Sequence, residues 1–147
     1  MVRFLGRYSS YIYALLRIVV GFFMILHGTQ KLFGVPAPAQ AIPPNAIVTV
    51  AGVLELICGL MVLLGLLASI GGFILSGLMA VAYFMVHQPM GALPIQNQGE
   101  LAAVYSFVFL YIAAAGGITS PARGERQLVE TRSAAPSPRR RSAAGRR

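Results

Sequence analysis

Charged residues are scarce in this sequence. They make up 11% of its 147 residues, whereas hydrophobic residues make up 56%. A soluble domain of ordinary composition has about a quarter of its residues charged. The scarcity therefore argues against a soluble domain and favours a membrane protein.

Cysteine is nearly absent as well, since Cys58 is the only one and lies in an apolar run. A single cysteine cannot form an intramolecular disulfide, a CxxC redox pair or a thiolate metal cluster. The sequence also shows no phosphate-binding loop, dinucleotide fingerprint or nucleophile elbow. Nucleotide binding and acyl transfer are therefore unsupported, and no motif encodes a cofactor.

The net charge of +8 comes from the two ends of the chain. The residues from 121 to 147 include eight arginines among Ser, Ala and Pro, a composition typical of a disordered segment. This segment has no interleaved aromatics, so we predict a disordered, Arg-rich cytoplasmic tail near anionic lipid and no binding to nucleic acid. Between residues 8 and 122 the charged residues sum to zero; they are Arg17, Lys31, Glu55 and Glu100.

Four apolar stretches are long enough, or nearly so, to cross a membrane. Crossing about 30 Å of hydrocarbon takes about 20 residues of α-helix. Proline-rich or polar segments separate the stretches, except for a tight turn between the second and the third. We therefore predict an all-α, integral membrane four-helix bundle in residues 1–120, with spans at about 11–33, 46–67, 70–86 and 101–119.

Basic residues predict the orientation of this bundle. Arg3 and Arg7 precede the first span, and the Arg-rich tail follows the last. Lysine and arginine concentrate on the cytoplasmic side of membrane proteins, so both termini are expected in the cytoplasm. The first apolar run is too long for a signal peptide and lacks a cleavage site, which indicates a retained helix. The two longer loops, 34–45 and 87–100, then face outward.

Helical depth places most ionisable groups in the outer half of the bundle. At 1.5 Å per residue, His27 lies about 9 Å below the outer end of the first span, and Glu55 about 13 Å down the second. Gly52, Glu55 and Gly59 share one helical face. Small residues mark the packed faces of membrane helices, so Glu55 is expected to face the bundle. A charge near mid-bilayer costs about 2.5–3.5 kcal/mol and is functional by default.

These positions predict a polar pocket that opens outward. By depth, we expect His27 to pair with Glu55. Lys31 is expected to extend to the outer interface, where it can pair with Glu100. The candidate catalytic residues are Glu55 and His27. The candidate substrate-binding residues are Lys31, His87, Asn97 and Glu100. The expected structural residues are Gly28, Gly52, Gly59 and Arg17, the last extending toward the inner membrane surface.

A quinone headgroup suits such a pocket. Its carbonyls accept hydrogen bonds from His or Lys, its reduction takes up protons, and its tail stays in lipid. Structural alternatives remain open: Lys31 as an interface anchor, His87 as a helix cap, and Glu55 as a lock between helices. A metal site would need His27, His87 and Glu55 without a spacing motif, and a haem would need both rings at one depth. No metal is predicted.

Several segments together resemble the DoxX family of small bacterial four-helix membrane proteins. They are RIVVGFFMILHGTQKLFG, GVLELICGLMVLLGL, HQPMG and NQGELAAVYSFVFLYIAAAGG, within residues 14–118. The resemblance implies a multi-pass protein of the bacterial inner membrane, and relatives include the membrane subunit of a thiosulfate:quinone oxidoreductase. The sequence departs at Gln98, where a glycine is usual, and at Ser120 and Pro121, where an acidic residue is usual. The positions that match the family are Arg17, His27, Lys31, Glu55, His87, Asn97 and Glu100.

Two functions are considered. The preferred one is the membrane subunit of a quinone-linked redox complex, which is not a self-sufficient enzyme because a partner supplies the electrons. The alternative is a non-catalytic scaffold or accessory subunit of a larger membrane complex. A small-solute permease is less favoured, because a chain of 147 residues without an inverted repeat can form a transport pathway only as an oligomer. The expected partners are the lipid bilayer and either another protein subunit or a second copy of this chain.

Overall fold

The computed structural model describes residues 5–38, 43 and 45–117. Within these residues the chain is all-helical, with four α-helices and no strand, so the predicted all-α fold is confirmed for this part of the chain. The tail predicted at 121–147 lies outside the described residues. The helices are α1 (Ser9–Phe33), α2 (Ala46–Leu64), α3 (Ala68–Ala82) and α4 (Glu100–Ala115).

The third helix is longer than the span predicted at 70–86. α3 continues into η2 (Tyr83–His87), a single π-helical turn, and then into η3 (Gln88–Met90), so the helical rod runs over Ala68–Met90. This rod, α1 and α2 are long and apolar enough to cross a membrane. The 16-residue α4 is shorter and reaches about 24 Å.

Particular residues begin and end these helices. The side chain of Asn45 caps α2 by accepting a hydrogen bond from the Val48 N–H at 2.9 Å. Gly34 follows α1 and Gly65 follows α2, both in the left-handed conformation that ends many helices. The second span, predicted to end at 67, therefore ends at Leu64, because Gly65 stops the helix there.

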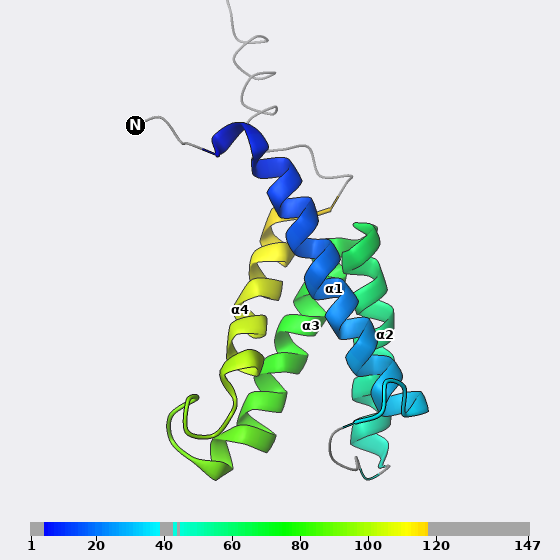
Figure 1. Cartoon of the computed structure of the whole chain (residues 1–147), viewed down its shortest axis with the longest axis vertical. Coiled ribbons are helices and arrows are strands. Elements are labelled where there is room, and N and C mark those ends of the chain that lie inside the picture. Colours follow the sequence, from blue (N-terminus) through cyan, green and yellow to red (C-terminus); the bar gives the residue numbers. More distant parts are fainter. Residues whose placement is uncertain (1–4, 39–42, 44, 118–147) are drawn as a thin grey trace, which may run out of the picture.

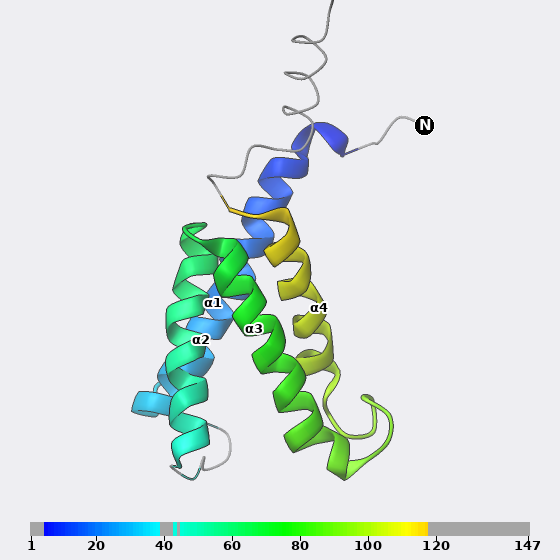
Figure 2. The ribbon, with the colours of Figure 1, turned by 180° about the vertical axis from the view of Figure 1, so that it is seen from behind.

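The helices form two pairs. α1 packs along α2, α3 packs along α4, and α2 contacts α3. The pairs come together at the end that holds the start of α1 and the end of α4, here called the terminal end (Figure 1). They diverge toward the opposite, loop end, where segments join α1 to α2 and the α3 rod to α4. The view from behind shows the same divergence between α2 and the α3–α4 pair (Figure 2).

Glycines let α1 and α2 approach closely. Gly21 faces Gly59 near the middle of the pair, and Gly28 faces Gly52 nearer the loop end. A Cβ atom built on Gly28 would lie 2.8 Å from the Gly52 carbonyl oxygen and 2.7 Å from the Leu56 backbone nitrogen. Side chains do not approach backbone atoms so closely. Small residues therefore set the distance between the two helices, as in many membrane helix pairs.

The other contacts between helices also depend on small residues. A Cβ atom on Gly71 would lie 3.1 Å from the Cys58 carbonyl oxygen of α2, and one on Gly72 would lie 2.9 Å from that of Phe109 in α4. Large apolar side chains are exposed on the outer faces of all four helices, as expected for helices in lipid. The buried core consists of Val20, Met24, Cys58, Val62, Ala68, Leu75, Met79, Phe109 and Ile112.

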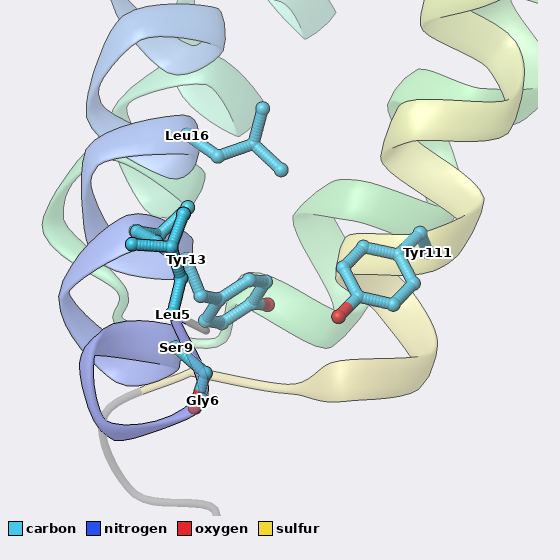
Figure 3. Close-up of a pocket in the computed structure, with 7 residues that line it drawn as sticks. Leu5, Gly6, Ser9, Tyr13, Leu16 and Tyr111 are labelled. Atoms are coloured by element: carbon cyan, nitrogen blue, oxygen red, sulfur yellow. The ribbon is translucent and has the colours of Figure 1, made fainter. Parts of the chain in front are cut away.

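Tyr13 joins α1 to α4 at the terminal end. Its hydroxyl group lies 2.5 Å from the Gly116 carbonyl oxygen and 3.3 Å from that of Ile112. The Tyr111 ring packs edge-on against Tyr13, with ring centroids 5.9 Å apart (Figure 3). A hollow of about 460 Å³ lies beside these rings, but no Asp, Glu, His or Lys lines it. This hollow therefore shares no lining residue with the predicted site.

Candidate functional site

An ion pair between Lys31 and Glu55 lies at the centre of the candidate site. Nζ of Lys31 donates a hydrogen bond to Oε1 of Glu55, whose side chain is 2% exposed. A carboxylate buried among apolar helices needs a partner, and Lys31 supplies it. The predicted pairing of His27 with Glu55 and of Lys31 with Glu100 is therefore wrong.

Gly52 explains why Lys31 reaches Glu55. A Cβ atom on Gly52 would lie 3.1 Å from Cβ of Lys31, so the lysine stem passes over a position of α2 that has no side chain. Glu55 is three residues further along α2, on the same face. The ammonium group therefore lies along α2 beside Glu55, whereas the prediction directed it toward the outer interface and Glu100.

The second carboxylate oxygen of Glu55 is unsatisfied. Oε2 is buried and has no hydrogen-bond partner among the described residues. Leaving a buried acceptor unpaired costs about 1–3 kcal/mol, and more for a charged group. Buried polar atoms without a protein partner are uncommon in native proteins, and many of them bind an ordered water molecule or an ion. Oε2 therefore marks the position where a hydrogen-bond donor would bind.

Glu55 lines a cavity of about 260 Å³, here called the polar cavity. All four helices contribute to its wall, together with the segment that precedes α4. The sulfur-containing side chains of Met24 and Met79 form part of its apolar surface. Four of the six residues predicted for the site line this one cavity, namely His27, Lys31, Glu55 and His87.

Asn97 positions the loop beside His87. The Asn97 side chain donates to the Gly91 carbonyl at 2.8 Å and accepts from the Gly99 N–H at 2.8 Å, and the residue is 1% exposed. Its backbone carbonyl oxygen lies 3.1 Å from Nδ1 of His87. A carbonyl oxygen can only accept, so Nδ1 carries the proton in this contact. Asn97 thus supports His87, which lines the polar cavity.

Gln98 lines the polar cavity but is absent from the predicted site. Its φ of 57° lies in the left-handed region, which is unfavourable for residues other than glycine. Hydrogen bonds from the Gly99 N–H to Asn97 Oδ1 and to the Pro94 carbonyl hold this turn. The available signal was that Gln98 departs from the glycine expected from the resemblance described in the sequence analysis. Tyr105 was also missed, because its spacing is equally typical of a packed aromatic residue.

His27 lies between two hollows. It is exposed, and it lines both the polar cavity and a groove of about 420 Å³ on α1 and α4. Leu101 and Tyr105 also line both hollows. Among the described residues, Glu55 accepts its hydrogen bond from Lys31 and none from the His27 ring. The imidazole is therefore accessible to a ligand in either hollow.

Glu100 does not line the polar cavity. It is exposed in the first turn of α4, where a carboxylate interacts favourably with the helix dipole. The structure thus separates Glu100 from the group formed by His27, Lys31, Glu55 and His87.

Arg17 is buried, whereas the sequence predicted that it extends to the inner membrane surface. It is 6% exposed, and its guanidinium carbon lies 5.4 Å from the centre of the Tyr13 ring. One guanidinium nitrogen donates to the Val62 carbonyl at 3.5 Å. The prediction is wrong because an aromatic ring and a backbone carbonyl provide contacts for this cation inside the molecule.

The arrangement combines hydrogen-bond donors with a buried acceptor. Lys31, Gln98 and the histidines can donate to a bound oxygen, while Glu55 can accept or carry a proton. Within the described part of the chain, no group of three or more His, Cys, Asp or Glu residues could hold a metal ion. The site is suited to binding a polar group and exchanging protons with it.

Three long apolar helices and a shorter fourth, with an ion pair buried between two of them, define a small multi-pass membrane protein. The sequence model of the DoxX family, described simply as DoxX, matches residues 12–88, which is more than half of the chain. The chain therefore belongs to the DoxX family. It is also 42% identical over 118 residues to a protein of Haemophilus influenzae described as an uncharacterized protein, covering 76% of this chain and 88% of that relative. No solved structure matches the chain.

Proposed function

We propose that this protein is the membrane subunit of a quinone-linked redox complex and that it binds a quinone headgroup in the polar cavity. The observation that carries the proposal is the state of Glu55. One of its oxygens is paired with Lys31, and the other is buried without a partner among the described residues, in a cavity between apolar helices. Ionisable groups inside a membrane are functional by default.

The size of the cavity supports a headgroup as ligand. Its volume of about 260 Å³ is just below the range of about 300–1,000 Å³ that holds drug-sized ligands. A single substituted ring is smaller than such a ligand, whereas a long tail would have to lie elsewhere. Methionine and leucine side chains can contact the ring faces, and the polar residues can contact its oxygens.

The side chains have distinct roles in this proposal. A bound quinone supplies the two-electron, two-proton chemistry. Lys31 donates a hydrogen bond to one of its oxygens, and His87 donates to the other from Nε2 when both ring nitrogens carry a proton. The ionised Glu55 accepts a hydrogen bond at Oε2 from a hydroxyl group of the reduced ligand and can take up or release a proton there. His27, which is exposed, transfers protons between the cavity and the outside. The electrons come from a partner protein.

The location proposed is the bacterial inner membrane, with both termini in the cytoplasm. The argument is the basic flanks of the chain, including Arg7 before α1 and eight arginines after residue 120. The polar cavity then lies in the outer half of the membrane. The partner subunit, or a second copy of this chain, would contact the exposed apolar faces of the helices.

A second candidate is an accessory subunit without chemistry of its own. The observation that favours it is that the Lys31–Glu55 pair joins α1 to α2. In this second function, the role of the pair is to hold the two helices together. In that case the exposed apolar faces would dock the subunits of a larger membrane complex.

Substitution of Glu55 distinguishes these functions. We expect the protein purified from its membrane to contain quinone, measured by organic extraction and mass spectrometry. Glu55→Gln should reduce this content about tenfold, which corresponds to about 1.4 kcal/mol of binding. Glu100→Gln is the matched control, because it changes the same group at an exposed position outside the cavity. Equal quinone content in the wild type and Glu55→Gln would contradict the proposal, and loss of a co-purifying subunit would then favour the accessory function.

A further inference from the structure

The α1–α4 side of the helix assembly widens near the polar cavity (Figure 1). Glycines pack α1 against α2, α2 against α3 and α3 against α4. Between α1 and α4, Tyr13 makes its contacts at the terminal end, and the two helices then diverge toward the loop end (Figure 1). The α1–α4 side is thus a place where the polar cavity can communicate with the surrounding lipid.

The groove of about 420 Å³ lies on this side. Apolar residues line most of it, including Phe23, Leu26 and Pro36, and the residues with polar atoms are His27, Gln30 and Tyr105. Gln30 is partly satisfied within the chain, because its amide donates to the Pro36 carbonyl at 3.2 Å. The groove is therefore suited to an apolar chain.

The groove and the polar cavity are adjacent. They share His27, Leu101 and Tyr105 as lining residues, so these three side chains form the boundary between them. The charged pair is on the cavity side of this boundary, because Lys31 and Glu55 line the polar cavity but not the groove. A molecule that occupied both hollows would place a polar group beside Glu55 and an apolar chain against α1 and α4.

We propose that the groove is a lateral entrance that holds the apolar tail of the ligand whose headgroup occupies the polar cavity. This inference rests on the proposed function and specifies its ligand as an amphipathic molecule that enters from the lipid between α1 and α4. During entry the tail moves from lipid into an apolar groove. Only the headgroup moves into a polar environment, that of the polar cavity. His27 contacts the junction between headgroup and tail.

Filling the groove tests this entrance. Leu26 lines the groove but not the cavity, so Leu26→Trp should exclude a tail and leave the headgroup site intact. The probes are two benzoquinones with the same ring substituents, one carrying a decyl chain and the other a methyl group. Leu26→Trp should weaken binding of the decyl compound about tenfold and change binding of the methyl compound by less than about twofold. Ile18→Trp is the control, since Ile18 is an exposed residue of α1 that lines neither hollow.

The outcomes separate the two proposals. If the wild type binds neither compound, the proposed function fails. Suppose instead that the wild type binds both compounds. If Leu26→Trp then leaves both affinities unchanged, or lowers them equally, the entrance is contradicted while the headgroup site stands. A quinone with a photoreactive group in its tail provides a test on the unmodified chain. It should label peptides from α1 and α4, and labelling confined to α2 or the α3 rod would overturn the entrance.

Discussion

Lys31 stabilises the charge of Glu55 inside the apolar part of the molecule, so the two residues depend on each other. Removing one member of a buried ion pair leaves an uncompensated charge and costs about 3–5 kcal/mol. Replacing both members by apolar residues of similar size is often neutral or stabilising. The stability of the protein therefore does not require this pair. Binding of a ligand that donates a hydrogen bond to Glu55 does require the carboxylate.

A double substitution separates stability from binding at this pair. Lys31→Met should lower the stability of the protein in detergent by about 3–5 kcal/mol, because Glu55 is 2% exposed and loses its partner. Lys31→Met combined with Glu55→Leu should recover most of this loss and yet contain no quinone. Thermal unfolding and quinone content measure the two effects. A double variant as unstable as Lys31→Met would show that the pair itself, and not the isolated charge, determines stability.

Four residues that line the polar cavity, His27, Lys31, Glu55 and His87, could be selected from the sequence, but the pairing could not. Helical depth and shared faces were sufficient to select His27, Lys31 and Glu55 as neighbours in one region. Depth does not say which helix a long side chain follows. Lys31 lies along α2 because Gly52 has no side chain, and this requires knowing how α1 and α2 pack. The contribution of Gln98 depends on a left-handed backbone conformation that the residue type disfavours.

The α1–α2 pair supports the site because its backbones are close together. Gly28 lies one turn before Lys31 on α1 and contacts the backbone of α2 at Gly52 and Leu56. Any side chain at position 28 would push the helices apart. The distance between Lys31 and Glu55 therefore depends on a glycine that makes no polar contact with either side chain.

Gly28→Ala should destabilise the protein by about 1–3 kcal/mol, the range typical of overpacking. The added Cβ atom would lie 2.7 Å from a backbone nitrogen of α2, and such an atom cannot move aside easily. Gly77→Ala is the matched control, since a Cβ atom at this position of α3 meets nothing within 4 Å. It should stabilise its helix by about 0.5–1 kcal/mol. Thermal unfolding in detergent measures both changes, and equal effects would contradict the close approach.

The number of helices followed from hydropathy, whereas their ends and divergence did not. Apolar runs predicted four helices because crossing a membrane needs a long apolar segment. The π-helical turn at Tyr83–His87, which continues the third helix, depends on hydrogen bonds that hydropathy does not report. The divergence of the two pairs depends on where each close contact lies along the helices. Small residues predicted the packed faces, but they did not predict the hydrogen bonds by which Tyr13 of α1 reaches the end of α4.

At the scale of the whole molecule, the start of α1 and the polar cavity lie at different ends (Figure 1). The start of α1, with Arg7, and the end of α4 lie at the terminal end (Figure 1). The polar cavity lies toward the loop end, because its residues come from the end of α1, the end of the α3 rod and the start of α4. If the basic flanks face the cytoplasm, protons reach the cavity from the outer side of the membrane.

Cysteine labelling tests this orientation. Cys58 is buried, so Cys58→Ala provides a background in which Ala92→Cys, in the exposed loop before α4, or Leu5→Cys, before α1, carries the only thiol. A charged maleimide that does not cross membranes should label Ala92→Cys in intact spheroplasts and Leu5→Cys only after lysis. The physical reason is the cost of moving Arg7 and the arginines after residue 120 across the membrane. The reverse pattern would place the polar cavity on the cytoplasmic side, and protons for the bound quinone would then come from the cytoplasm.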